Sequence, residues 1–227
     1  MKRALFCSVV LFSIVASAMA YGGIVGSKHD LVSDWNKGSL LMRQTLNNYL
    51  SPCVYCHTPH DAASNAGAPL WNRPVPVGPY TTYQSPTMNT TVSNPPDSAS
   101  LVCLSCHDGT IAVDAVLKKP SSFIQSTYHY KMLPEANACG ECHNGGPAHD
   151  ARGTYLTTDL SNDHPVSMDY PTPVQDPDFV QPKPSDLLFF NGKVECPTCH
   201  DPHKTDYGNF LRKSNTGSAL CLSCHIK

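Results

Sequence analysis

The chain has 227 residues and a formal net charge of −2, with 15 % charged residues, 20 prolines, 11 cysteines and 11 histidines. Proline at about twice its usual share interrupts helices and removes strand hydrogen-bond donors, so long regular elements are not expected. The near-neutral charge, without a basic patch, argues against a nucleic-acid-binding protein, and no later apolar run reaches the roughly 18 residues of a membrane span.

Residues 1–20 predict a cleavable export signal. Two basic residues precede the apolar stretch Ala4–Ser17, and a small-x-small cleavage site ends at Ala20. Cys7 lies inside this segment, so the expected mature chain, starting at Tyr21, holds ten cysteines. We therefore expect an exported protein without a transmembrane anchor, located outside the cell or at its surface, with the periplasm as the alternative.

Few regular elements are predicted in the rest of the chain. Ser39–Leu50 combines good helix formers and is followed by a proline, which predicts a short helix before the first cysteine pair. The proline-rich stretches Pro69–Pro96 and Pro165–Pro184 are expected to be connections. Asp186–Cys196 predicts a small hairpin with an Asn-Gly turn that delivers Cys196.

All ten remaining cysteines fall in five Cys-x-x-Cys-His units, the attachment pattern of c-type haem. The two thiols can form thioethers with the vinyl groups on one porphyrin edge, and the next residue then lies under the iron as the proximal ligand. A zinc ribbon or a redox dithiol gives no reason for a histidine after every second cysteine. The attachment cysteines are Cys53, Cys56, Cys103, Cys106, Cys139, Cys142, Cys196, Cys199, Cys221 and Cys224, and the proximal histidines are His57, His107, His143, His200 and His225. We therefore predict five covalently bound haems.

Six further histidines are available for five distal positions. His60 and His203 each end a Cys-x-x-Cys-His-x-Pro-His segment, and a link of three residues stiffened by proline cannot reach the far side of the same haem. Each is therefore predicted to ligate a different haem, which makes two irons neighbours. His29 and His164, each beside an aspartate and upstream of a motif pair, are predicted as two more distal ligands.

The third unit has two competing distal candidates, His129 and His149, of which we favour His129. The repeated pattern divides the chain into a first two-haem module at 21–118, an inserted single-haem segment at 119–157 and a second two-haem module at 158–227. The histidine count closes within each module. With two histidines at every iron, the irons have no open position for catalysis.

At these motifs the sequence resembles the multihaem c-type cytochromes of the doubled CXXCH family. The resembling segments are Gly26–Asp30, Cys53–His60, Ala68–Arg73, Leu101–Gly109, Thr158–Val166 and Cys196–His203. Within that family the chain is similar to the OmcE-type tetrahaem cytochromes, which polymerise into extracellular conducting filaments. The unit at Cys139–His143 is a departure from their four haems.

The resemblance implies a multihaem cytochrome c fold, with short helices and a small hairpin wrapped around a row of bis-histidine haems. It also implies an electron carrier and not an enzyme, with further copies of itself, other redox proteins or extracellular acceptors as partners. Because those filaments use a distal histidine from the next subunit, His29, nine residues into the mature chain, is the expected bridging ligand. A soluble periplasmic electron shuttle is the alternative, and a multihaem reductase ranks after it.

Overall fold

A computed structural model describes residues 23–32, 51–121, 143–146 and 150–226. The predicted export signal and the predicted helix at Ser39–Leu50 lie outside the described residues. So do Cys139 and Cys142 of the third motif and both candidates for its distal ligand, His129 and His149.

The described chain contains only short regular elements, as predicted from its proline content. The longest is a helix of 10 residues. In chain order the elements are η1 (Pro52–Tyr55), β1 (Thr81–Thr82), α4 (Ser98–His107), η2 (Arg152–Thr154), β2 (Asp159–Leu160), β3 (Met168–Asp169), β4 (Lys193–Val194), α6 (Cys196–Cys199), η3 (Thr216–Ser218) and η4 (Cys221–Ser223). Most of the backbone is therefore turn and extended connection.

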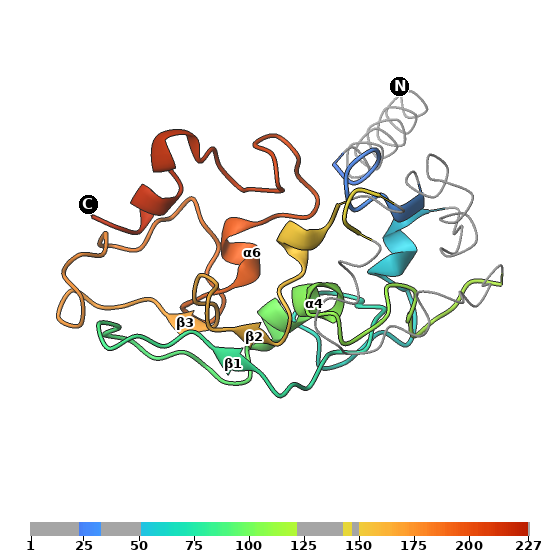
Figure 1. The fold of residues 1–227 in the computed structure, drawn as a ribbon, viewed down its shortest axis with the longest axis horizontal. Coiled ribbons are helices and arrows are strands. Elements are labelled where there is room, and N and C mark those ends of the chain that lie inside the picture. The colour runs from blue at the N-terminus through green and yellow to red at the C-terminus, as the bar shows by residue number, and fades with distance from the viewer. Residues whose placement is uncertain (1–22, 33–50, 122–142, 147–149, 227) are drawn as a thin grey trace, which may run out of the picture.

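Four Cys-x-x-Cys-His motifs coincide with four of the helical turns: η1, α4, α6 and η4. Positions i and i+3 lie on one face of such a turn, so both thiols of a motif point to the same side. In η1 the Ser51 side chain caps the turn by accepting from the Cys53 amide at 3.4 Å. In Figure 1 the first and last described motifs lie towards opposite ends of the longest axis, with α4 and α6 between them.

Two small sheets join distant parts of the chain. Strand β1 pairs in parallel with β2, matching Thr81 with Asp159, and β3 pairs antiparallel with β4, matching Met168 with Val194. The predicted Asn-Gly turn forms, with Asn191 at φ 53° and Gly192 at φ 86°. Only the tip of the predicted hairpin pairs with itself, through the bridge between Phe190 and Lys193, because β4 turns to β3 instead.

The segments that follow the two Cys-x-x-Cys-His-x-Pro-His motifs have the same backbone geometry. In each, the residue after the proximal histidine donates its amide hydrogen to the carbonyl of a residue with positive φ. The residue two positions after that one donates its own amide hydrogen back to the carbonyl of the second cysteine of the motif. These hydrogen bonds are Thr58–Leu70 (2.9 Å) and Asn72–Cys56 (2.8 Å) in the first copy, and Asp201–Phe210 (2.6 Å) and Arg212–Cys199 (2.9 Å) in the second. Leu70 and Phe210 have φ of 54° and 57°. The duplication seen in the sequence is thus repeated in three dimensions.

Burial is divided among small clusters of side chains. Tyr55 and Val116 form one apolar cluster, and Tyr80, Leu104 and Leu160 form another. The largest fully buried side chains include polar ones such as Arg73, Glu195 and Asn72. No helix in the described part of the chain has the length and apolarity to cross a membrane.

The proline-rich stretch Pro69–Pro96 is more than a connection. It begins with Trp71, Asn72 and Arg73, all of which are buried, and it contains β1. The C-terminal end of the predicted inserted segment also contacts the first module, because the Leu156 amide donates to the His107 carbonyl at 2.8 Å. Within the first module, the Lys118 amide donates to the Asn72 side chain at 2.8 Å.

Candidate haem sites

Three proximal histidines are held in the same way, by a backbone carbonyl against one ring nitrogen. The Nδ1 atoms of His57, His107 and His200 lie 2.8, 2.8 and 2.9 Å from the carbonyl oxygens of Pro69, Thr154 and Asn209. Because a carbonyl can only accept, Nδ1 carries the proton and Nε2 presents its lone pair. This arrangement orients an imidazole for a metal at Nε2, and it fits the proximal role.

Histidine rings face one another across distances that suit a shared iron. A first-row metal binds an imidazole nitrogen at about 2.0 Å, so two imidazoles on opposite sides of one metal have ring centroids about 6.4 Å apart. The described pairs have centroid separations of 6.1, 6.2 and 6.4 Å. They are His29 with His107, His57 with His203, and His164 with His225. Each pair joins a predicted proximal ligand to a predicted distal one.

The pairing crosses the boundary between the predicted modules. His203 follows the proximal histidine of the second module, yet its ring lies parallel to His57 of the first, at an interplanar angle of 21°. The number of histidines in each module stays as predicted, but this ring contact joins one module to the other. The turn that carries His203 lies against Gly23, at the start of the described chain, which brings this histidine close to the first module.

His29 lies inside its own chain and not at a free end. Its ring stacks on Phe210 with 4.2 Å between centroids, and it faces His107. Burial, with the nearby His107 as the next cause, lowers the pKa of His29 to about 4, so the imidazole is neutral at physiological pH and able to bind a metal. The role of His29 as a bridge to another subunit stays a prediction, because the structure contains one copy of the chain; within that copy its ring lies 6.1 Å from the ring of His107.

His60 and His200 remain without a histidine ring opposite them among the described residues. Both side chains are exposed. His143 is described, but both cysteines of its motif lie outside the described residues. Three of the five predicted irons therefore have two histidines in position, and the other two do not have a described distal partner.

The attachment cysteines of neighbouring motifs lie side by side. The eight described cysteines form no disulfide. A hydrogen bond between the Cys103 and Cys196 thiols raises the pKa of Cys103 and lowers that of Cys196, so the second and fourth motifs touch. Burial raises the pKa of Cys56 to about 12, and nearby Cys106 adds to the rise. Burial likewise raises the pKa of Cys199 to about 11, with Cys224 as the next cause.

The contact between α4 and α6 is organised around a buried acid, Glu195, which is 1 % exposed. Its Oε2 accepts from the hydroxyls of Ser100 and, at 2.9 Å, Ser167. Ser100 also accepts from the Cys196 amide at 3.1 Å. Burial raises the pKa of the Glu195 carboxyl, and the two hydroxyls oppose that rise. Glu195 thereby joins the second motif to the fourth through residues far apart in the sequence.

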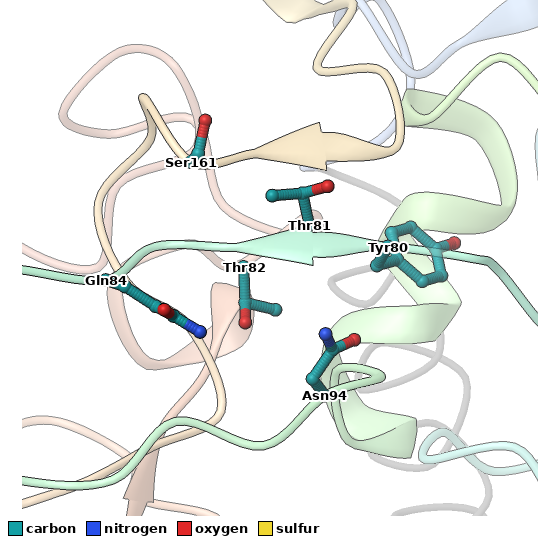
Figure 2. Close-up of a pocket in the computed structure, with 6 residues that line it drawn as sticks. All are labelled: Tyr80, Thr81, Thr82, Gln84, Asn94 and Ser161. Carbon is teal, nitrogen blue, oxygen red and sulfur yellow. The ribbon is translucent and has the colours of Figure 1, made fainter.

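A surface pocket of about 280 Å³ lies beside β1 and is lined by hydroxyl, amide and phenol side chains. Figure 2 shows Thr82, Gln84 and Asn94 turned toward the same space, with Thr81 on the other side of the strand. The Tyr80 hydroxyl donates to Asp108, and burial raises the pKa of Tyr80 well above its ordinary value. The pocket is lined by no histidine or cysteine, so it is separate from the predicted haem ligands.

In a comparison with protein families, residues 190–227 match the doubled CXXCH motif. That span contains the motifs Cys196–His200 and Cys221–His225 and the β4–α6 region that holds Glu195. A search of curated proteins finds no match. The doubled motif supports a multihaem c-type cytochrome that takes part in electron transfer, and the CXXCH motifs indicate covalently bound haem.

Sequence reasoning missed the groups that hold the ligands. The carbonyls that orient the proximal histidines carry no side-chain signal at all. Arg73 lies in a segment that was used only for the family resemblance. Glu195 directly precedes Cys196, but only the cysteine was assigned a role. The available signals were that Arg73 is the one charged residue between Asp61 and Asp97, and that Glu195 directly precedes a haem motif.

The pairing of His57 with His203 has a direct test. We expect His203→Ala to leave the iron at Cys53–His57 with one histidine. That iron should become high-spin, because a single imidazole cannot keep it low-spin. The indole of Trp71, whose ring centroid lies 6.0 Å from that of His57, should report the change as a shifted and broadened Nε1–H signal in NMR. Lys204→Ala, a change to the next residue, is the control and should leave that signal in place. A high-spin iron with an unchanged Trp71 signal would assign His203 to another haem.

Proposed function

We propose that the protein is a pentahaem c-type cytochrome that carries electrons along a row of bis-histidine haems, and that it is a subunit of an extracellular conducting filament. The observation that carries the electron-transfer role is the set of three facing histidine pairs at 6.1–6.4 Å. Irons closed by two imidazoles exchange electrons and offer no site for a substrate, which favours a carrier over a multihaem reductase.

The neighbouring cysteines support the order of the row. Cys103 is hydrogen-bonded to Cys196, and Cys56 and Cys199 lie close enough to Cys106 and Cys224, respectively, for these neighbours to raise their pKa values. Since a thioether fixes one porphyrin edge to its cysteine, adjacent cysteines bring adjacent porphyrin edges together. The proposed order is therefore the first, second, fourth and fifth motif, which agrees with their succession along the long axis in Figure 1.

Each haem, when bound, supplies an iron that accepts and passes on a single electron. The chain supplies orientation and protection. The carbonyls of Pro69, Thr154 and Asn209 hold the proximal rings in place, and Trp71 and Phe210 cover ring edges and faces of His57 and His29. These fixed ligands limit the rearrangement that accompanies each change of charge at iron.

The third haem would be held by Cys139, Cys142 and His143, with His129 as its distal ligand and His149 as the alternative. We keep the division into modules at 21–118 and 158–227 with a single-haem segment at 119–157. We likewise keep export after residue 20 and an extracellular or cell-surface location, with the periplasm as the alternative. The motif at Cys139–His143 distinguishes the chain from the tetrahaem filament cytochromes it resembles.

The filament requires a ligand that crosses between copies, and His60 is the better candidate. His60 and His200 are both exposed and lack a histidine ring opposite them in the described chain. If His60 of one copy closes the iron at His200 of the next, the contact is heterologous, so it repeats as an open helix. A chain that closes His200 with its own His60 would instead be a soluble periplasmic shuttle with the same absorption spectrum.

Five haems and closed irons can be tested on the purified protein. Intact-mass spectrometry in denaturant should give a chain starting at Tyr21 with five covalent haem increments. Carbon monoxide added to the reduced protein should leave the spectrum nearly unchanged, because no axial position is open. Four increments, or reactive thiols at the motifs, would contradict the haem count. A fast carbon monoxide shift would restore the reductase as a candidate.

A further inference from the structure

Arg73 is a buried cation whose hydrogen-bond acceptors are all neutral. Its side chain is 0 % exposed. Nε donates to the Ser105 hydroxyl at 3.3 Å, and the terminal nitrogens donate to the carbonyls of Ser105 at 2.9 Å, Ala112 at 2.8 Å and Val113. Four neutral acceptors satisfy most of the guanidinium protons without cancelling its charge. A buried charge held in this way exerts its field on whatever lies nearby, since little water screens it.

The residues around Arg73 belong to two haem attachment sites. Ser105 lies between Cys103 and Cys106, so the guanidinium is bonded directly to the loop of the second motif. The preceding residue, Asn72, donates through Nδ2 to the Val54 carbonyl at 2.7 Å, inside the loop of the first motif. The Arg73 charge also acts on Cys56, where it opposes the rise in pKa that burial causes. Arg73 therefore stands between the first and second motifs.

The charge of Arg73 is not paired with a carboxylate. Among the described residues no acidic oxygen lies within 4.0 Å of its guanidinium, and the carboxylate of buried Asp108 accepts from Tyr80 and Thr110 instead. The basic residues in the equivalent part of the second copy are both paired. Arg212 bonds to Asp201 at 3.0 Å, and Lys213 bonds to Asp186 at 2.6 Å. The duplication is thus asymmetric in charge.

We propose that Arg73 raises the reduction potentials of the two haems attached at Cys53–Cys56 and Cys103–Cys106. The inference rests on the proposed electron-transfer function and adds to it a residue that sets where electrons reside. Reduction takes one electron from the donor and converts ferric to ferrous iron, with no bond made or broken. It lowers the positive charge at the porphyrin by one. A fixed cation nearby is repelled less by the reduced state, so it favours reduction.

The expected size follows from Coulomb's law. A unit charge about 10 Å from another, at an effective dielectric constant of about 20, changes an equilibrium constant roughly tenfold. For a one-electron couple a tenfold change corresponds to about 59 mV. Spectroelectrochemical titration of a multihaem protein resolves shifts of this order, because the titration curve is fitted as a sum of one-electron components and the variant is compared with the wild-type holoprotein.

The test compares three variants of the haem-loaded full chain, titrated with dithionite and ferricyanide. Arg73→Gln should lower the reduction potentials of two components by about 59 mV each, which is about a tenfold change in each equilibrium constant. Arg73→Lys keeps the charge and should restore most of the difference, although it breaks the hydrogen-bond pattern as well. Lys213→Gln, at the equivalent position of the second copy, is the matched control and should shift no component comparably, because that charge is partly accessible to water and paired with Asp186.

Ser105→Asp provides an independent arm if Arg73→Gln does not load its haems. It leaves the guanidinium in place, sets a carboxylate against it and should also lower two potentials. Equal shifts in Arg73→Lys and Arg73→Gln would show that packing, not charge, is responsible, and unchanged potentials in both would also overturn the proposal. Haem content and spin state are measured on the same samples. A wild type lacking five low-spin haems would count against the proposed function, whereas correct haems with unmoved potentials would count against Arg73 alone.

Discussion

His60→Ala should abolish filaments and leave one high-spin haem per chain, whereas His29→Ala should produce one high-spin haem and retain the filaments. Each variant removes one predicted distal histidine, but the two histidines differ in whether another histidine ring lies opposite them in the same chain. His29 faces His107 within its own chain at 6.1 Å, so its loss opens an internal iron. His60 is exposed and has no such partner among the described residues, so its loss removes a contact between copies. Electron microscopy and absorption spectroscopy of the purified variants measure both results.

Three other results would each redirect the assignment. A monomeric wild type would rule out the bridge altogether and favour the periplasmic shuttle. Filaments that persist in His60→Ala, with one iron high-spin, would mean that His60 closes an iron of its own chain. Filaments lost in His29→Ala and kept in His60→Ala would restore His29 as the bridging ligand. Lys204→Ala, an exposed change beside His203, controls for general effects on assembly.

Glu195→Ala should be the most destabilising single change within the protein part of the fold. It removes the acceptor of the Ser100 and Ser167 hydroxyls and leaves a cavity where α4 meets the start of α6. Buried donors without an acceptor, together with the lost packing, cost about 2–4 kcal/mol of unfolding free energy. Urea unfolding of the haem-loaded protein, followed by the loss of low-spin absorption, measures the difference. Asp186→Ala, which breaks an exposed pair with Lys213, should cost no more than about 1 kcal/mol.

The pH dependence of stability should identify the same carboxyl. Burial raises the pKa of Glu195, and neighbouring Asp97 adds to the rise while Lys193 and the two hydroxyls oppose it. A raised folded-state pKa means that the folded protein binds the proton more tightly. This contribution to stability is therefore complete below the unfolded pKa of about 4.3 and is lost as the pH rises through the folded value. Glu195→Gln should remove that loss above about pH 4.3, and an unchanged pH profile would place the effect elsewhere.

Sequence reasoning reached the local features because each depends on a few adjacent residues. The scarcity of regular structure follows from proline, and the turn at Asn191 and Gly192 follows from the positive φ that these residues adopt readily. The spacing of each Cys-x-x-Cys-His motif suits one helical turn, which is where α4, α6 and the shorter turns place it. Such features need no knowledge of the remaining chain.

The pairing of histidines was beyond that reasoning because it depends on contacts between distant segments. His203 lies 6.2 Å from His57, in a turn that packs against Gly23, far away in the sequence. His29 was expected at a free end, yet the stacking on Phe210 draws it inward. Arg73 donates to the backbone carbonyls of Ala112 and Val113, and the apolar side chains of these residues give no sign of that role in the sequence. A list of candidate ligands could be predicted, but not their partners.

The hydrogen bond from His107 to Thr154 has a consequence for anyone who wishes to convert this protein into a four-haem version. Thr154 belongs to the segment that carries the extra motif, and its carbonyl oxygen lies 2.8 Å from Nδ1 of His107. A clean excision of residues 119–157 would therefore strip an acceptor from a neighbouring ligand and damage two haems instead of one. A shorter deletion that ends before Ala151 keeps the η2 turn and the Leu156 contact in place. The proposed extra haem segment therefore also holds a ligand of the neighbouring motif, and a deletion that removes the Cys139–His143 motif should leave Thr154 in place.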